Sequence, residues 1–388
     1  MHFYFKVEAV FHTFLTVACL YVLVRCVYPL KISTFARLLI AIGVLIVSKY
    51  HYWSLLIYGD MWSPELPFGV VLVLGWLFCA FVLLTVFTLI GDVAGLALTV
   101  SGRRPVFRRI APRWRAGSVV LALALAALGV QQAIKVPDVR RVELAIDNLP
   151  PEFNGFRFVQ LSDLHISRLF PESWARAVVD RTNELSPDLV LISGDLIDGY
   201  TDARRSDVTP LADLQARYGV IGIPGNHEYY FDYSAWAPVF KGMGIKMLEN
   251  QHVLLQQGSA TLTIAGITDD VAPKYGFAGP DLARALAGAP ANAPTILLSH
   301  RPEAAMENAD AGIDVQLSGH THGGMILGFD QVVARANEGY VSRGYDVGRM
   351  KLYVSNGTGL WMGFPVRLGV PSEITEFVLR PANFSAGK

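Results

Sequence analysis

The first third of the chain contains four apolar stretches that are each long enough to cross a lipid bilayer as a helix. A helix that spans the hydrocarbon core needs about 20 predominantly apolar residues. The first stretch is too long for the apolar part of a cleaved signal peptide, and no small-residue cleavage site follows it. We therefore expect residues 1–134 to form a transmembrane region of four helices, at residues 10–28, 35–55, 67–90 and 117–134.

The net charge of the chain changes sign at the end of this region. Only 17% of the 388 residues are charged, against roughly 25% in an ordinary soluble domain. Residues 1–134 carry a net charge of +7 and the remaining residues −7, and an acidic second part gives no reason to expect a nucleic-acid partner. The three cysteines all precede residue 134, so the second part needs no disulfide and offers no thiol chemistry.

Lysine and arginine predict how the four helices cross the membrane, because loops rich in these residues stay in the cytoplasm. The loop between the third and fourth stretches contains six arginines, and the loop between the first and second adds Lys31 and Arg37. These two loops share a side and hold eight cations, against five on the other side. We expect the Arg-rich loop to be cytoplasmic. Because the number of spans is even, the second part of the chain should then lie on the periplasmic or outer side.

The second part of the chain has the pattern of an α/β domain. We expect a linker at residues 135–150 and a domain at residues 151–388, because short apolar runs alternate there with helical patterns. Near-continuous apolar runs are typical of strands buried on both faces. The predicted strands are at 156–161, 189–193, 219–223, 262–267, 295–298, 313–317, 352–354 and 374–379, and the clearest helices are at 172–185 and 280–286.

Polar residues follow the ends of several predicted strands. Asp163, Asp195, Asn226, His300 and His320 each come directly after such an end. Ligands of open α/β sheets bind at this edge, in loops that a rigid scaffold holds in place. The chain order therefore delivers several polar groups to one edge.

These residues belong to five short segments whose side chains are typical ligands of divalent metals. Asp163 with His165, and His320 with His322, are two residues apart and would point to one face of an extended chain. Glycines before Asp195, Asn226 and His320 would allow positive φ and close backbone approach. Each segment alone is usually structural, but five of the domain's six histidines fall in the set. The seven candidate ligands, too many for one tetrahedral ion, are Asp163, His165, Asp195, Asn226, His300, His320 and His322.

The series Asp-x-His, Gly-Asp, Gly-Asn-His-Glu, His and Gly-His-x-His resembles the calcineurin-like metallophosphoesterase superfamily, in its bacterial membrane-anchored branch. The resemblance covers about residues 150–380 and implies a four-layer αββα sandwich with two divalent metal ions (Mn, Fe or Zn). It implies that Asp163, His165 and His322 bind one metal and that Asp195 bridges. It further implies that Asn226, His300 and His320 bind the second metal, and that the catalytic His227 stabilises the transition state or protonates the leaving group. Glu228 stands where the family more often has Asp, and Met325 where that branch often has Gln.

The sequence leaves three functions open. The first is a membrane-anchored phosphoesterase of the bacterial inner membrane that hydrolyses a phosphodiester or phosphomonoester with metal-activated hydroxide, on a lipid-linked or envelope substrate. The second is a cytoplasm-facing pyrophosphohydrolase of a nucleotide-linked lipid, and the third is a non-enzymatic metal-binding sensor. For each of these functions the lipid bilayer is a partner. We expect the four spans to act as an anchor, because the spans contain too few ionisable residues for an ion path.

Three other features have both a structural and a functional interpretation. The aromatic residues between Tyr229 and Trp236, and those between Trp361 and Phe364, are either core or an apolar rim that holds a lipid or a base. Arg367 either contacts a phosphate or stabilises the local fold.

Overall fold

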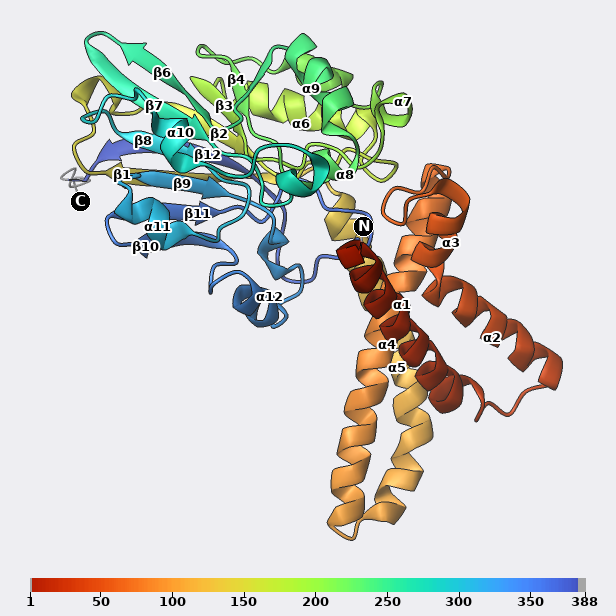
Figure 1. The fold of residues 1–388 in the computed structure, drawn as a ribbon. Coiled ribbons are helices and arrows are strands. Elements are labelled where there is room, and N and C mark those ends of the chain that lie inside the picture. Colours follow the sequence, from red (N-terminus) through yellow and green to blue (C-terminus); the bar gives the residue numbers. More distant parts are fainter. Residues whose placement is uncertain (1, 383–388) are drawn as a thin grey trace. The chain divides into compact units, whose positions relative to one another are not determined.

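The computed structural model describes residues 2–382, and the side chains from residue 9 onward. The chain forms two compact units (Figure 1). The first contains Met1–Gln132 and Met362–Val366, and the second contains Ala133–Trp361 and Arg367–Lys388. The last six residues of the expected domain, 383–388, lie outside the described part of the chain.

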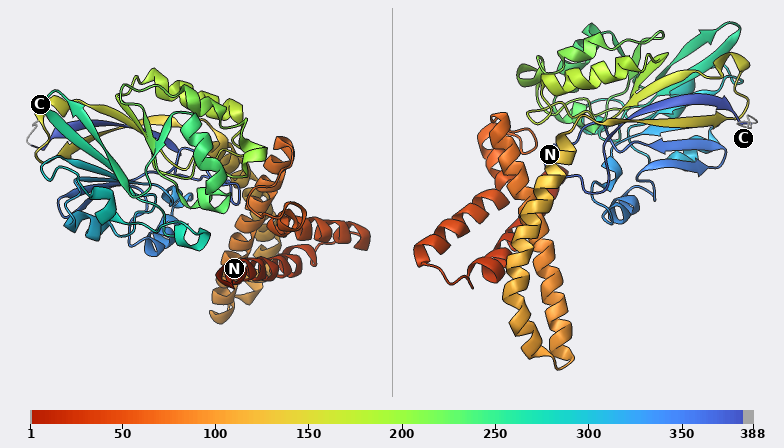
Figure 2. Two further views of the ribbon diagram at one scale, coloured as in Figure 1. Left: turned by 45° about the horizontal axis from the view of Figure 1, so that its top comes forward. Right: turned by 180° about the vertical axis from the view of Figure 1, so that it is seen from behind.

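The first unit is helical. Three helical stretches are long and apolar enough to cross a membrane, and there are up to four if the bent pair α2–α3 counts as one span. The axis bends by 62° within that pair. Figure 2 shows α4 and α5 as a long antiparallel pair from two further directions. The helices are α1 (His2–Val22), which continues as a π-helical turn (Leu23–Val27), α2 (Thr34–Ser48), α3 (Tyr50–Tyr58), α4 (Phe68–Val100) and α5 (Arg104–Ile134).

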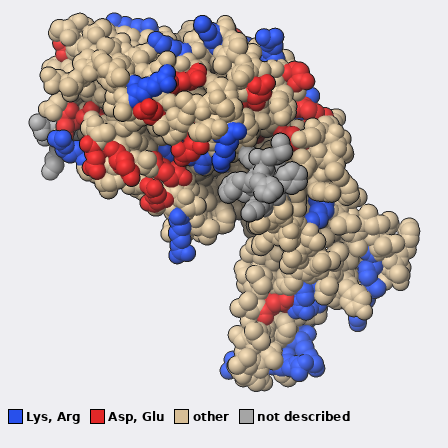
Figure 3. Space-filling view, in the orientation of Figure 1, with Lys and Arg blue, Asp and Glu red and all other residues tan. Residues whose placement is uncertain are grey.

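The six arginines expected in a loop lie largely within a helix, so that expectation is wrong. Helix α4 runs ten residues past the predicted end of the third span, to Val100. The chain turns at Gly102, whose φ is +78°, and α5 already begins at Arg104. Figure 3 shows Lys and Arg gathered at this end of the helical unit.

Two groups of contacts join the helices of the first unit. Gly91 and Gly95 of α4 allow close packing, since a Cβ atom there would lie 2.1 Å from Trp114 and 2.3 Å from Phe107 of α5. Asp92 of α4 accepts hydrogen bonds of 2.7 Å from Tyr21 and from Arg25. The ion pair partly neutralises two of the few ionisable groups in the spans.

A short segment from the end of the chain also belongs to the helical unit. Within Met362–Val366, the ring of Phe364 lies edge-on to that of Phe78, with centroids 6.3 Å apart. Met362 is buried as well. Phe364 of this cluster therefore packs against the helices, although Phe364 and Trp361 both stay partly exposed.

The second unit contains two mixed six-stranded sheets. Their orders are β1-β12-β2-β3-β4-β5 and β10-β11-β9-β8-β7-β6. Most neighbouring strands are parallel, and β12–β2, β6–β7 and β10–β11 are antiparallel. The strands are β1 (Asp138–Ile146), β2 (Arg157–Leu161), β3 (Leu189–Ile192), β4 (Val220–Gly222), β5 (Ile245–Met247), β6 (Gln251–Gln257), β7 (Ala260–Gly266), β8 (Thr295–Leu298), β9 (Val315–Ser318), β10 (Arg343–Val347), β11 (Met350–Val354) and β12 (Glu373–Pro381).

Strand β1 occupies most of the stretch that the sequence suggested as a linker. It pairs in parallel with β12 over its whole length, from Asp138 opposite Glu373 to Ile146 opposite Pro381. Only Leu144 and Ile146 of this strand are buried. An edge strand with so few buried residues resembles a polar linker in sequence, which explains the error.

The two sheets share one hydrophobic core. Phe158 and Phe377 of the first sheet and Ile264 and Leu317 of the second belong to the same buried cluster. A second cluster joins helices α10 and α11 to the second sheet. The helices of this unit are α6 (Glu172–Glu184), α7 (Thr201–Arg204), α8 (Asn226–Tyr230), α9 (Tyr233–Gly242), α10 (Leu282–Leu286), α11 (Ala305–Asp310) and α12 (Asp330–Ala336).

Candidate metal centre

The loops that carry the predicted site residues come from both sheets. They follow β2, β3 and β4 in the first sheet, and β8 and β9 in the second. Backbone hydrogen bonds join these loops, from the Asp163 N–H to the Gly194 carbonyl (3.0 Å) and from the Gly319 N–H to the His300 carbonyl (2.8 Å). The site is therefore built on the ends of strands in two sheets.

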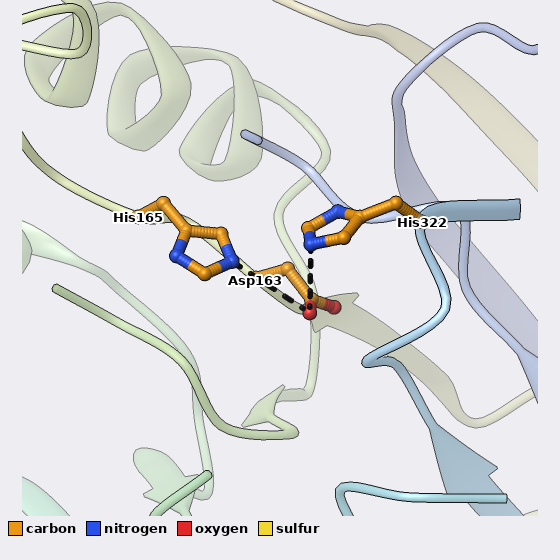
Figure 4. A group of neighbouring side chains, drawn as sticks. All are labelled: Asp163, His165 and His322. Carbon is orange, nitrogen blue, oxygen red and sulfur yellow. Dashed lines mark ion pairs between the residues drawn. The ribbon is translucent and has the colours of Figure 1, made fainter. Parts of the chain in front are cut away.

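The first cluster consists of Asp163, His165 and His322 (Figure 4). The Nε2 atoms of His165 and His322 lie 3.9 and 3.7 Å from Asp163 Oδ1. Ligand atoms bound at about 2.1 Å to one divalent ion are separated by roughly 3 to 4 Å. All three side chains are buried, and His165 Nε2 has no hydrogen-bond partner among the described residues. A buried, unpartnered imidazole nitrogen facing a carboxylate fits a metal ion.

The second cluster consists of Asp195, His300 and His320, with Asn226 beside them. His300 Nε2 lies 3.2 Å from Asp195 Oδ2 and 3.1 Å from Asn226 Oδ1. The same Asp195 oxygen is 3.7 Å from His165 Nε2 of the first cluster. One carboxylate oxygen therefore lies within reach of both clusters, as a bridging ligand must.

Hydrogen bonds on the far side of two imidazoles orient them toward the clusters. His165 Nδ1 lies 2.8 Å from Asp198 Oδ1, and His300 Nδ1 lies 2.8 Å from the Ser193 carbonyl. An acceptor at Nδ1 keeps the proton there and leaves the Nε2 lone pair free for a metal. Both contacts therefore favour the tautomer that a metal site needs.

Asp198, which the sequence analysis missed, also contacts His227. Its Oδ1 atom lies 2.6 Å from His227 Nδ1. Burial lowers the pKa of His227, but the negative charges of Asp195 and Asp198 outweigh burial and raise it to about 9. The side chain of His227 is 12% exposed, which is more than the side chains of His165, His300 and His322.

Glu228 connects the loops after β3 and β4. Its carboxylate accepts hydrogen bonds from the backbone N–H groups of Asp195 (2.9 Å), Leu196 (2.7 Å) and Gly225 (2.7 Å). The side chain is fully buried. Glu228 therefore fixes the backbone that carries Asp195, and the longer side chain fills the position where the family more often has Asp.

The local backbone differs from what the sequence analysis expected. Asp163, His165, His320 and His322 do not lie in extended chain, since their φ angles are +52°, +44°, +68° and +49°. The φ of Asp195 is +55°. Left-handed conformations are uncommon outside glycine and cluster at functional sites. Sharp turns, and not the alternation of a strand, bring each pair of side chains together.

The glycines were expected to supply positive φ, and only Gly194 does so, with φ of +97°. Gly225 and Gly319 instead allow close approach. A Cβ atom on Gly225 would lie 2.3 Å from Asp195 Oδ1, and one on Gly319 would lie 2.2 Å from Asp163 Oδ2. Both would displace a carboxylate of the site.

The structure also places the aromatic residues that follow Asn226, and Arg367. Tyr229, Phe231, Tyr233 and Trp236 are at most 1% exposed, so these four are core. Tyr230 is partly exposed, and its ring centroid lies 5.2 Å from that of His227. Arg367 is also buried and donates to four backbone carbonyls. The acceptors include the carbonyls of His322 (3.2 Å) and Asn356 (2.6 Å). The role of Arg367 is therefore structural.

Comparison with known proteins gives consistent matches. Residues 156–324 match the family model described as calcineurin-like phosphoesterase. An uncharacterised metallophosphoesterase of Campylobacter jejuni is 33% identical over 291 residues, 74% of this chain and 75% of that protein. A transmembrane protein with metallophosphoesterase domain from Danio rerio is 34% identical over 273 residues, 68% of this chain, and the chain spans 62% of its length. A solved structure of sulfate thiohydrolase SoxB covers 60% of this chain and 58% of its own at 14% identity, with a TM-score of 0.38.

Proposed function

Because the chain belongs to the calcineurin-like phosphoesterase family, we propose that it is a membrane-anchored phosphoesterase with two divalent metal ions. It hydrolyses a phosphodiester or a phosphomonoester. The observation that carries this proposal is the position of Asp195 Oδ2, which is 3.7 Å from His165 Nε2 and 3.2 Å from His300 Nε2. A single oxygen between two ligand clusters suits a pair of ions that share one bridging carboxylate.

The side chains divide the work between holding metals and moving a proton. Bound divalent metals (Mn, Fe or Zn) lower the pKa of water and stabilise the charge that develops on a phosphoryl group. His227 donates a proton to the leaving-group oxygen, and Asp198 holds its ring. Asp163, His165 and His322 hold one ion, Asn226, His300 and His320 hold the other, and Asp195 belongs to both.

The proposed architecture is a four-span membrane region over residues 1–134 followed by a four-layer αββα sandwich. The support is the number of apolar helices, up to four, and the core that the two sheets share. Because β1 pairs with β12 along its whole length, we place the start of the catalytic domain near Asp138 instead of residue 151. The excess of cations at the α4–α5 end supports a cytoplasmic position for that end and a periplasmic or outer position for the catalytic domain of a bacterial inner-membrane protein. A membrane anchor favours a lipid-linked or envelope substrate.

Metal-dependent hydrolysis by the purified full-length chain tests the proposal. We expect turnover of bis-p-nitrophenyl phosphate or p-nitrophenyl phosphate when Mn²⁺ is present and none after chelation. His227→Ala should lower kcat by roughly 100-fold or more while the metal content stays unchanged. His252→Ala is the matched control, since His252 lies outside the site and contacts the Ala285 carbonyl. Undiminished activity in chelator or in His227→Ala would overturn the proposal.

A further inference from the structure

Arg301 follows the candidate ligand His300 and lies beside the second cluster. Its loop comes after β8, between the loops after β7 and β9 that carry Asp269 and His320. The hydroxyls of Ser299 and Ser318 donate to the Arg301 carbonyl at 3.0 and 3.2 Å. A serine of the same loop and the last residue of β9 therefore fix the backbone of Arg301.

A buried carboxylate holds one side of the Arg301 guanidinium. Its Nε atom donates to Asp269 Oδ2 at 2.8 Å, and the other oxygen of Asp269 accepts from the Val271 N–H at 2.9 Å. The Asp269 side chain is fully buried, while the Arg301 side chain is 21% exposed. The buried carboxylate thus holds the guanidinium in place and leaves its Nη side directed at the site.

On that side, Arg301 Nη1 lies 2.9 Å from His320 Nε2. This contact requires a lone pair on Nε2, because a guanidinium only donates hydrogen bonds. A metal bound through Nε2 uses that lone pair. A metal bound through Nδ1 requires the neutral ring to carry its proton on Nε2. In both cases Arg301 Nη1 loses the His320 acceptor when the second cluster binds a metal, while Asp269 still holds Nε. Nη1 can then donate to a ligand in the site.

We propose that Arg301 Nη1 binds a terminal oxygen of the substrate phosphoryl group, and that this contact favours a phosphomonoester or a diphosphate over a phosphodiester. The proposal rests on the proposed function. A phosphomonoester has three terminal oxygens that share the negative charge, whereas in a diester one of these positions is esterified and uncharged. Two metals can bind two of the oxygens, and the third then needs a donor. A guanidinium is well suited to it, since its hydrogen bonds to phosphate are charge-assisted.

The test compares wild type with Arg301→Gln, and Arg284→Gln serves as a control because Arg284 is an exposed residue of helix α10. Three quantities are measured on the full-length, Mn²⁺-loaded protein. They are the metal content, the affinity for inorganic phosphate by calorimetry, and the ratio of kcat/KM for p-nitrophenyl phosphate to that for bis-p-nitrophenyl phosphate.

We expect Arg301→Gln to keep its metal and to bind phosphate roughly 10- to 100-fold more weakly, as for the loss of a charge-assisted hydrogen bond. The monoester-to-diester ratio should fall by about tenfold or more. Unchanged phosphate affinity, or an unchanged ratio, would overturn the proposal. Loss of metal from Arg301→Gln would also overturn it, because Arg301 would then act on His320 and not on substrate. If wild type hydrolyses neither ester, the proposed function fails, but the phosphate titration still decides the role of Arg301.

Discussion

Asp198 Oδ1 lies 2.6 Å from His227 Nδ1, and the same oxygen lies 2.8 Å from His165 Nδ1. A single buried carboxylate therefore positions both a candidate metal ligand and the candidate proton donor. His165 and His227 strongly favour its ionised form, so the pKa of Asp198 falls well below its ordinary value although burial alone would raise it. The orientation of the metal cluster and the proton affinity of His227 thus depend on the same side chain.

Replacing Asp198 should change the pH dependence of kcat. Burial lowers the pKa of His227, and Asp195 and Asp198 raise it to about 9. The imidazolium is the proton donor, so activity should be present below this pKa and lost as the pH rises through it. Asp198→Asn removes one of the negative charges that raise the pKa, and should move the basic limb down by about one unit or more.

A kcat profile between about pH 6 and 10 measures that shift. Bound metal adds positive charge and lowers the pKa of His227 in both proteins, so the difference between them remains informative. Asp346→Asn, on the exposed strand β10, is the control and should leave the profile in place. A basic limb at the same pH in Asp198→Asn and wild type would exclude His227 as the donor controlled by Asp198.

Glu228→Ala should destabilise the second unit and weaken metal binding. The substitution leaves three N–H groups, those of Asp195, Leu196 and Gly225, without their acceptor in a buried site. We expect a loss of about 2 to 4 kcal/mol in the free energy of unfolding, measured by thermal unfolding, together with a lower affinity for Mn²⁺. Glu228→Gln keeps one carbonyl oxygen as an acceptor and should therefore lose less stability. Equal stability of wild type and Glu228→Ala would contradict this role.

Arg367→Lys should disturb the position of His322. The Nη1 and Nη2 atoms of Arg367 reach carbonyls on separate turns, including those of His322 (3.2 Å), Asn356 (2.6 Å) and Gly359 (2.9 Å). A lysine ammonium cannot donate in this planar fork. We expect a loss of about 1 to 3 kcal/mol in stability and weaker binding of one metal, read by calorimetric titration. If Arg367→Lys bound both metals with wild-type affinity, the positioning role would be wrong.

The membrane orientation can be tested by labelling single cysteines after Cys19, Cys26 and Cys79 are replaced. Ser101 lies in the turn between α4 and α5, and Ser259 lies in the exposed turn between β6 and β7. In intact bacterial spheroplasts, a membrane-impermeant maleimide should label Ser259→Cys, and Ser101→Cys only after lysis. The reverse pattern would place the catalytic domain in the cytoplasm and favour the cytoplasm-facing pyrophosphohydrolase.

Sequence reasoning found most of the strands that carry the site. All eight predicted strands are present, and β8 has the predicted bounds. Their apolar runs are buried on both faces, which makes them distinct from the surrounding chain. Strands β1, β5, β6 and β10 were missed because they are short or expose many of their residues. Such strands are held by pairing with a neighbouring strand, and the hydrophobic pattern of their own residues therefore gives little indication of them.

The candidate metal ligands were predictable because each combines a metal-binding side chain with the end of a strand. Asp198 and Arg301 were not, since their roles depend on contacts with His227 and with Asp269 from other loops. The left-handed backbone at Asp163 and His165 was also missed, because nothing in these residue types requires it. Contacts between distant loops decide these features, and a single sequence does not contain them.

The most direct test of the account is a metal titration of the purified full-length chain after chelation. Hydrolysis of bis-p-nitrophenyl phosphate is followed as Mn²⁺ is added to metal-free wild type and to Asp195→Ala. Because Asp195 Oδ2 lies within 3.7 Å of ligand atoms in both clusters, we expect activity to saturate at about two equivalents of metal. Asp195→Ala should stay inactive throughout. Full activity in the metal-free protein, or an Asp195→Ala variant as active as wild type, would contradict it.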